Sequence, residues 1–530
     1  MSVHCDHQDE VVPRQSNYVG LIAELRRNLP ILSILDQMED VKPYECDGLS
    51  AYRQVPRAVI LPRTESDLKR VLEACRQHRV PVVVRGAGTG LSGGAMPHAE
   101  GVVVSLARFM QILEIDPQAR TARVQPGVRN LALSEAAAPL NLYYAPDPSS
   151  QIACTLGGNV AENSGGVHCL KYGLTVHNVL SARALVLSED GVDEVTFGSA
   201  SPDAPGLDLL AALNGSEGML AVVTEILVKL TPKPEIAQVV MASFDSVVTA
   251  ADAVAAIIAA GIIPAGLEMM DKQAIAAVEP FARAGYDTDA AAILLCESDG
   301  TSEEVAHEIT RITEVLRNAG VRQIRTSQNE AERLLFWAGR KAAFPAVGRI
   351  TPDYLCMDGT IPRKRLGEML AAISEMEKKY SLRCANVFHA GDGNLHPLIM
   401  FDANDPDETT RALAFGAEIL ELSVALGGTI TGEHGVGIEK LAQMCVQFSP
   451  EELSAFSAVK HAFDPQGLLN PGKVIPTTAR CREYKQTGTG HRHDQQTACA
   501  RESTSVPARI HERGYIPAVL TLGGLAIKPG

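Results

Sequence analysis

The sequence lacks the basic excess that nucleic-acid binding would require. Its 63 Asp and Glu residues outnumber 48 Lys and Arg residues, which gives a formal net charge of −15 and a pI near 5.5. A protein that binds a phosphate backbone presents a basic stripe, and none stands out along this chain. The charge balance therefore argues against a nucleic-acid partner and favours a small-molecule ligand.

Segments that would direct the chain to or across a membrane are also missing. Residues 1–12 contain no basic start followed by an apolar run, as a Sec-type signal peptide requires. The longest apolar stretch, residues 248–263, is interrupted by Asp252 and does not match a transmembrane segment. We expect a soluble, cytoplasmic protein, with peripheral association at the inner face of the cell membrane as the alternative.

No Cys-x-x-Cys pair occurs among the 11 cysteines, which are spread along the chain. Zinc knuckles and self-contained iron–sulfur sites need closely spaced cysteines, so neither is expected. Reduced core thiols are a better interpretation than disulfides for a cytoplasmic chain.

The length of 530 residues exceeds one ordinary core and predicts at least two domains. The contents of 46% hydrophobic and 21% charged residues are typical of a globular protein. The Pro-rich TPKP stretch at residues 231–234 marks a domain boundary. The expected divisions are an N-terminal helical segment (1–49), a first domain (50–232), a second domain (233–476) and a disordered tail without a catalytic part (477–530).

Apolar periodicity and β-branched runs predict α+β structure in both domains. The expected helices are 18–35, 68–78, 247–260, 303–319 and 330–344, and the expected strands are 81–85, 102–106, 121–124, 220–227, 293–297, 384–388 and 395–401. In the second domain this alternation suits an α+β cap built on an antiparallel sheet.

A glycine-rich loop, GAGTGLSGGA, follows the first β-branched run at residues 81–85. It is not a Rossmann fingerprint, because Leu91 takes the place of the third glycine and a poor helix start follows. It is not a Walker loop, because no Lys-Ser/Thr pair follows. What remains is a nest of bare backbone N–H groups, with the Thr89 and Ser92 hydroxyls, that suits a pyrophosphate. A flexible surface turn is the alternative.

Further glycine-rich segments occur downstream, namely DPSS, TLGGNVAENSGG, KYG and GSEG. Together with RGAGTGLSGGA they resemble the FAD-binding domain of the vanillyl-alcohol oxidase / p-cresol methylhydroxylase superfamily, and they cover most of residues 50–232. The resemblance implies a two-subdomain FAD-binding domain of the vanillyl-alcohol oxidase type. Some members link FAD through a histidine at the end of the first loop. Gly94 and Ala95 occupy that place here, which implies non-covalent FAD.

The same resemblance implies which residues contact the cofactor. Those expected at the pyrophosphate are Gly86, Gly88, Thr89, Gly90 and Ser92; those along the ribityl chain and isoalloxazine are Asp147, Pro148, Thr155, Gly158 and Ser164; Val223 is expected near the adenine, and Asn470 in the closing NPGK segment.

Two histidines flank the turn in HAGDGNLH, at positions 389 and 396. The β-like runs on either side predict a hairpin that sets the two rings side by side. Two imidazoles and one carboxylate make a natural metal site, and Glu433 in GEHGVG is the candidate carboxylate. Structural histidines without a ligand role are the alternative.

HAGDGNLHPLI, GEHGVGIEK and LLNPGK resemble the C-terminal domain of the D-2-hydroxy-acid dehydrogenase branch of this superfamily. The branch includes D-lactate dehydrogenases, 2-hydroxyglutarate dehydrogenases and glycolate oxidases, and the resemblance spans residues 16–476. It implies FAD-dependent oxidation of a small 2-hydroxy acid to the 2-oxo acid by hydride transfer to flavin N5.

The chemistry of that reaction assigns a role to each residue type. A divalent metal, Zn²⁺ or Mn²⁺, on His389, His396 and Glu433 would chelate the substrate and lower the pKa of its hydroxyl. His434 would be the general base, because imidazole titrates near neutrality. Arg340 would pair with the substrate carboxylate through its guanidinium fork, with a solvated helix charge as the alternative.

One departure bears on the substrate. In the 2-hydroxyglutarate enzymes a basic residue precedes the Asp of the DGTIP-like segment by two places, and Cys356 stands there in this chain. The lost cation favours a monocarboxylate such as glycolate, with D-lactate as the alternative.

The sequence contains neither an NAD-binding fingerprint nor a cysteine motif for an iron–sulfur cluster. Electrons from the reduced flavin are therefore expected to pass to a partner protein or a quinone. The resemblance to the glycolate oxidases of this branch implies that the partners are an iron–sulfur subunit and a second flavin-domain subunit. The remaining alternatives are a stand-alone D-2-hydroxy-acid dehydrogenase, a non-catalytic flavin subunit and a metal-dependent hydrolase. The hydrolase leaves the flavin-like half unexplained.

Overall fold

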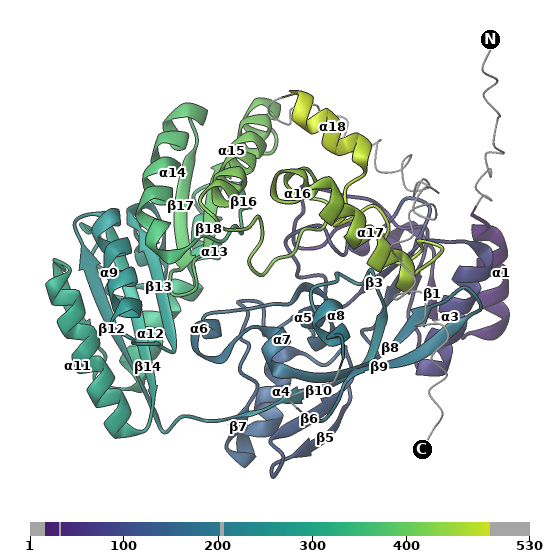
Figure 1. Ribbon diagram of the computed structural model, residues 1–530, viewed down its shortest axis with the longest axis horizontal. Helices are drawn as coiled ribbons and strands as arrows, with labels where there is room; N and C mark the ends of the chain where they lie inside the picture. Colours follow the sequence, from purple (N-terminus) through teal and green to yellow (C-terminus); the bar gives the residue numbers. More distant parts are fainter. Residues whose placement is uncertain (1–15, 31–32, 202–205, 488–530) are drawn as a thin grey trace.

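The computed structural model describes residues 16–30, 33–201 and 206–487, which form two lobes lying side by side (Figure 1). The first lobe contains a four-stranded sheet, a five-stranded sheet and a two-stranded pair of β7 (Leu142–Tyr143) and β11 (Thr231–Pro232), and the second is built on one large sheet. The fold class expected from the sequence, α+β with an antiparallel sheet in the second domain, is confirmed. Among the described residues, no helix is both long and apolar enough to cross a bilayer.

A four-stranded sheet opens the first lobe, with strand order β1-β2-β4-β3. Its strands are β1 (Ile34–Leu35), β2 (Val59–Ile60), β3 (Val82–Arg85) and β4 (Val102–Ser105). The β2 and β3 strands run parallel to β4, and helix α3 (Glu65–His78) makes the crossover between them. The glycine-rich loop starts where β3 ends, so the sheet presents it at one edge.

The second sheet of this lobe is antiparallel, with strand order β5-β6-β10-β8-β9. Its strands are β5 (Ile112–Asp116), β6 (Thr121–Val124), β8 (Val179–Leu187), β9 (Val192–Gly198) and β10 (Val222–Lys229). The long connection from β6 to β8 carries the DPSS and TLGG segments, which gives them room to reach the other sheet.

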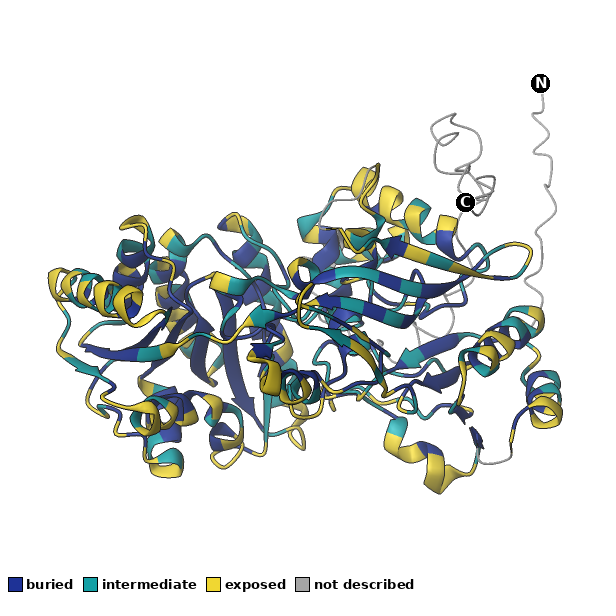
Figure 2. Cartoon of the chain, turned by 90° about the horizontal axis from the view of Figure 1, so that it is seen from below, coloured by how far each residue is buried: buried dark blue, intermediate teal, exposed yellow. Residues whose placement is uncertain are grey.

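The second lobe is organised around a seven-stranded antiparallel sheet, with strand order β15-β12-β14-β13-β17-β18-β16. Its strands are β12 (Ile236–Phe244), β13 (Gly266–Asp271), β14 (Ala292–Gly300), β15 (Gln323–Thr326), β16 (Asp353–Cys356), β17 (Arg383–His389) and β18 (Asn394–Phe401). β13 and β18 are buried along their whole length and β17 is buried except at Arg383, and the strands of this sheet are largely dark blue in Figure 2.

Helices cover both faces of this sheet, which explains why its strands read as nearly continuous apolar runs. Met269 and Phe388 belong to the core on one face, with α9 (Val247–Ala259) and α14 (Leu366–Tyr380). Met270 and Val387, one residue along each strand, belong to the core on the other face, with α10, α12 and α13. These three helices are α10 (Lys272–Ala282), α12 (Glu330–Lys341) and α13 (Ala343–Val347).

The C-terminal part of the chain returns from the second lobe to the first. Helices α15 (Pro406–Ala425), α16 (Leu441–Gln447) and α17 (Pro450–Phe463) lead to Leu469, which forms a parallel bridge with Val82 of β3. The N–H of Asn470 donates to the carbonyl of Val82 at 2.8 Å. The NPGK segment is therefore held against the sheet that presents the glycine loop.

Two expected helices are shorter than the periodicity indicated. Helix α1 (Tyr18–Asn28) ends before Leu29, which is extended because Pro30 follows it. Further along, Ile34 and Leu35 form β1 of the first sheet, so the segment 1–49 is not purely helical. The second case is the helix expected at 330–344, which is divided between α12 and α13.

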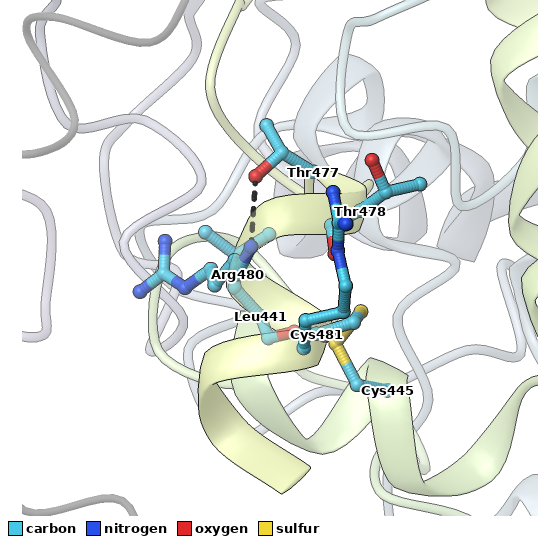
Figure 3. The surroundings of a disulfide bond; sticks show 7 residues. Leu441, Cys445, Thr477, Thr478, Arg480 and Cys481 are labelled. Atoms are coloured by element: carbon cyan, nitrogen blue, oxygen red, sulfur yellow. Dashed lines mark hydrogen bonds between the residues drawn. A yellow bond between two sulfur atoms is a disulfide. The ribbon is translucent and has the colours of Figure 1, made fainter. Parts of the chain in front are cut away.

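The C-terminal expectations need correction. Thr478–Thr487 form helix α18 rather than part of a disordered tail, and residues 488–530 lie outside the described part of the chain. Cys481 of α18 forms a disulfide with Cys445 of α16 (Figure 3), so the expectation of reduced thiols throughout is wrong. The packing of α18 on α16 brings the two Cα atoms to 5.3 Å, which the spacing of cysteines in the sequence does not reveal.

The disulfide predicts a specific thiol count. Under denaturing conditions, treatment with a reductant should expose two additional thiols in the parent chain. The Cys481→Ser variant should show no such increase, because Cys445 then has no partner. Titration with a chromogenic disulfide reagent before and after reduction measures both. Equal thiol counts before and after reduction in the parent would contradict the bond.

Candidate active site

The β17–β18 hairpin carries His389 and His396, as the sequence predicted. Pairing places Val387 opposite His396, and His389 two residues further along β17. Because side chains two apart share a face of a strand, both rings point to the same side of the sheet. Their centroids lie 4.9 Å apart in an edge-on arrangement.

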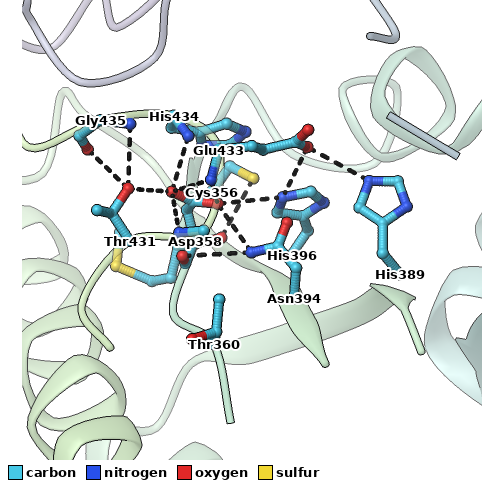
Figure 4. Close-up of polar contacts among 12 residues, drawn as sticks. Cys356, Asp358, Thr360, His389, Asn394, His396, Thr431, Glu433, His434 and Gly435 are labelled. Atoms are coloured by element: carbon cyan, nitrogen blue, oxygen red, sulfur yellow. Dashed lines mark hydrogen bonds and ion pairs between the residues drawn. The ribbon is translucent and has the colours of Figure 1, made fainter. Parts of the chain in front are cut away.

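Glu433 meets both histidines (Figure 4). Its Oε1 lies 3.3 Å from His389 Nε2 and 3.4 Å from His396 Nε2. One ligand atom from each of these residues lies within 4.8 Å of the others, and His396 Nε2 has no hydrogen-bond partner among the described residues. Two imidazole nitrogens and a carboxylate fit the donor preference of Zn²⁺ and also suit Mn²⁺.

The charge state of Glu433 suits a cation ligand. Burial alone would raise the pKa of this carboxyl, but His389, His396 and His434 outweigh burial and lower it to about 2. Glu433 is therefore an anion at neutral pH.

Asp358 holds the GEHG loop in place, and sequence reasoning did not identify it as a site residue. Its carboxylate accepts backbone N–H bonds from residues 432–434 at 2.9–3.3 Å. It also accepts the side-chain amide of Asn394 at 2.9 Å, and so joins the loop to the start of β18. The carboxyl is fully buried. Burial opposes its ionisation, but His434 and Lys440 hold its pKa well below the ordinary value.

His434 lies against His396 on the other side from His389. The two rings are stacked with centroids 4.9 Å apart and an interplanar angle of 3°. Nδ1 of His434 is buried without a hydrogen-bond partner among the described residues. Burial and the electrostatic contributions of His396 and Lys440 lower the pKa of His434 to about 4, against an opposing contribution from Asp358.

Arg340 lies beside the histidines rather than in solvent, so the alternative of a solvated helix charge is wrong. It is 2% exposed, and its Nε donates to Oε2 of Glu268 at 2.8 Å. The other oxygen of Glu268 lies 2.7 Å from Nδ1 of His389. Sequence reasoning missed Glu268, because it appears only as one polar residue within a buried strand.

The glycine loop and the TLGG segment lie against one another in the first lobe. A side chain at Gly86 would collide with the Thr155 hydroxyl, which accepts the N–H of Gly158 and caps α5 (Leu156–Glu162). Gly88 has a φ of +70°, which favours glycine, and the Ser92 hydroxyl is buried without a partner among the described residues. A bare backbone with an unpaired buried hydroxyl fits the oxygens of a pyrophosphate.

Asp147 forms part of a half-buried charged contact between the lobes. Its Oδ2 lies 2.7 Å from Nδ1 of His168, whose Nε2 lies 3.1 Å from Glu297 of β14. Burial would lower the pKa of His168, but the two carboxylates overcome it and raise that pKa well above the ordinary value. The imidazolium therefore joins the first lobe to the cap sheet.

The other expected flavin residues lie around the same region. Pro148 follows Asp147, and Ser164 follows α5, where its carbonyl accepts the N–H and hydroxyl of Thr175. Val223 lies on β10, while Thr89 and Gly90 continue the glycine loop. The Asn470 amide donates to the carbonyls of Gly94 and Glu217, which ties NPGK to two flavin-like loops.

The flavin-like loops adjoin the histidine cluster. Glu217 of GSEG accepts the N–H groups of Val436 and Gly437 at 2.6 and 2.8 Å. A Cβ at Gly165, in NSGG, would lie 2.6 Å from Oε2 of Glu433. The region expected to hold the flavin and the region that could hold a metal are therefore parts of one site.

The chain is similar to known proteins over most of its length. Residues 56–192 match the FAD binding domain family, and residues 233–474 match the family of FAD linked oxidases, C-terminal domain. The glycolate oxidase subunit GlcD of Escherichia coli strain K12 is 59% identical over 474 residues, which covers 89% of this chain and 94% of that protein. GlcD of Bacillus subtilis is 41% identical, over 83% of this chain and 93% of that protein. A D-lactate dehydrogenase of Anaerostipes hadrus is 31% identical and covers 81% and 91%.

Solved structures show the same fold at low sequence identity. p-Cresol methylhydroxylase superposes with a TM-score of 0.73 at 17% identity, covering 86% of this chain and 96% of that one. The 4-ethylphenol oxidase of Gulosibacter chungangensis superposes with a TM-score of 0.69 at 16% identity, covering 87% of this chain and 98% of that one. These likenesses establish the fold, and the sequence matches establish the family. The chain belongs to the FAD-linked oxidase family that includes the GlcD subunits of glycolate oxidase.

Proposed function

We propose that this protein oxidises a small 2-hydroxy acid, glycolate first, to the 2-oxo acid. The observation that carries the proposal is the junction of the Glu433 cluster with the flavin-like loops at Gly165. An oxidase of this kind must hold the substrate hydroxyl and the flavin in neighbouring positions, and the closeness of Gly165 to Glu433 supports the proposal. The similarity to two GlcD subunits supports glycolate, and the more distant similarity to D-lactate dehydrogenases supports D-lactate as the alternative.

Each bound group would supply one kind of chemistry. FAD, held without a covalent bond, supplies a hydride acceptor. A divalent cation held by His389, His396 and Glu433 supplies Lewis acidity to the substrate hydroxyl.

The protein's own residues bind the substrate and accept its proton. His434 lies next to the cation ligands, and its buried Nδ1 has no hydrogen-bond partner among the described residues. Its pKa of about 4 keeps the ring neutral at pH 7, so it is able to take the hydroxyl proton as general base. Arg340 lies on the far side of His389, with Glu268 between them, and its remaining N–H groups bind the substrate carboxylate.

Cys356 bears on the charge of the substrate. It lies at the end of β16, is 6% exposed, and directs its thiol to the carbonyl of Met357. A neutral side chain here offers no partner for a second carboxylate, which favours a monocarboxylate over a dicarboxylate.

Electrons would leave to a protein partner or a quinone. The names of the GlcD relatives describe them as subunits of glycolate oxidase, which supports a multi-subunit complex here. An iron–sulfur subunit and a second flavin-domain subunit are the proposed partners, at the inner face of the cell membrane or in the cytoplasm. A stand-alone D-2-hydroxy-acid dehydrogenase is the second candidate.

The roles of Glu433 and His434 can be separated by substitution. Glu433→Gln removes the anionic ligand and should lose the metal, with activity partly restored by excess divalent ion. His434→Asn should keep metal and FAD but slow flavin reduction about 100-fold or more, the scale of general-base catalysis. Elemental analysis and anaerobic stopped-flow absorbance measure these effects. Metal loss in His434→Asn but not in Glu433→Gln would reverse the assignment.

The electron acceptor is tested with the purified chain. Glycolate should bleach the flavin under anaerobic conditions, and dichlorophenolindophenol should then be reduced far faster than NAD. D-lactate in a parallel reaction tests the alternative substrate. Efficient NAD reduction by the chain alone contradicts electron transfer to a partner.

The mode of FAD attachment is tested by acid precipitation. Because no histidine stands at the end of the glycine loop, precipitation should release the yellow colour into the supernatant. Absorbance of the two fractions measures this, and colour retained by the pellet would refute non-covalent attachment.

A further inference from the structure

Glu268 contacts two site residues that the sequence keeps far apart. It lies on β13, is 1% exposed, and its Oε1 lies 2.7 Å from Nδ1 of His389. Its Oε2 accepts Nε of Arg340 at 2.8 Å and lies 2.7 Å from Nη2 of the same guanidinium. One buried carboxylate therefore spans a proposed metal ligand and the proposed carboxylate-binding cation.

Regular secondary structure, rather than a loop, builds this arrangement. β13 pairs with β17 so that Met269 faces Phe388 and Met270 faces Val387, and the same register continues to Glu268 and His389. Directly opposed residues of an antiparallel pair have Cβ atoms about 5 Å apart, within reach of a carboxylate and an imidazole. Helix α12 covers this face and brings Arg340 above the pair.

Each contact constrains the orientation of a functional group. An imidazole whose Nδ1–H donates to a carboxylate presents its lone pair at Nε2, and Nε2 is the atom 3.3 Å from Glu433. A guanidinium has five N–H donors, and Glu268 accepts the one on Nε. Nη2 lies 2.7 Å from the same carboxylate but has no hydrogen-bond partner among the described residues, so the Nη groups can bind a second carboxylate in fork geometry.

We propose that Glu268 is a positioning residue for both halves of substrate binding. Through one oxygen it fixes the tautomer and ring orientation of His389 as a ligand. Through the other oxygen it orients the Arg340 guanidinium toward the substrate carboxylate. The inference rests on the proposed function, which supplies the metal and the substrate carboxylate. Glu268 touches neither of them, so its role is exerted through the two neighbours.

Glu297 provides a matched control. It lies on the adjacent strand β14, is 2% exposed, and also binds α12, through Arg333 at 2.7 Å and through the indole of Trp337. Its other contact is with His168 and not with His389. Glu297→Gln therefore removes the same charge from a comparably buried contact to the same helix, without touching a proposed metal ligand.

The test measures zinc affinity on the purified FAD-containing protein, by competition with a chromophoric chelator. Glu268→Gln should raise the zinc Kd about 10-fold or more, the scale on which such outer carboxylates act. It should also raise KM for glycolate more than it lowers kcat, because Arg340 loses its orientation. Glu297→Gln should keep the parent zinc Kd. The thermal unfolding midpoints of both variants measure how much each lost charge lowers the stability of the fold.

Several outcomes overturn the proposal. They are a parent-like zinc Kd in Glu268→Gln, or an equal loss of zinc affinity in both variants, which would reflect packing alone. If Glu268→Gln does not fold, Glu268→Asp keeps the charge but is too short to span both partners. In that variant, zinc Kd and glycolate KM both at parent values would overturn it. A parent that binds no zinc contradicts the proposed metal site as well, whereas failure of the variants alone contradicts only this inference.

Discussion

The fully buried carboxylate of Asp358 accepts three consecutive backbone N–H groups, at residues 432–434. Buried N–H groups are costly to leave unpaired, so the loop keeps its shape only while this anion is in place. The shape of the loop determines where Glu433 meets the histidines of the β17–β18 hairpin. Asn394, at the start of β18, binds the same carboxylate, so the hairpin and the loop share one anchor.

The site also depends on contacts that cross between the lobes. Glu217 accepts N–H groups from the loop after His434, and the NPGK segment closes over Gly94 through Asn470 and Lys473. The imidazolium of His168 bridges Asp147 and Glu297. Charged and backbone contacts of this kind fix direction as well as distance. They therefore align the flavin-like loops with the histidine cluster more closely than apolar packing alone would.

Helix α12 shows how the cap sheet supports this alignment. Arg333, Trp337 and Arg340 recur at helical spacing along one face and donate to two buried glutamates on neighbouring strands. Glu297 contacts His168 of the first lobe, and Glu268 contacts His389 of the proposed metal site. A single helix thus contacts both halves of the site, and its amphipathic pattern in the sequence indicated only that one face is buried.

The sequence by itself determined the features that arise from neighbouring residues. Two β runs around AGDGN predict a hairpin, and strand alternation then places His389 and His396 on one face. Bare glycines predict an anion-binding nest, and motif resemblance supplied the family. Only the tertiary structure decided the pairings between distant residues: Asp358 with Glu433, 75 positions apart; Glu268 with Arg340, 72 apart; and Cys445 with Cys481, 36 apart. Local chemistry sets a residue's capacity to bind, but the packing of whole helices and strands selects its partner.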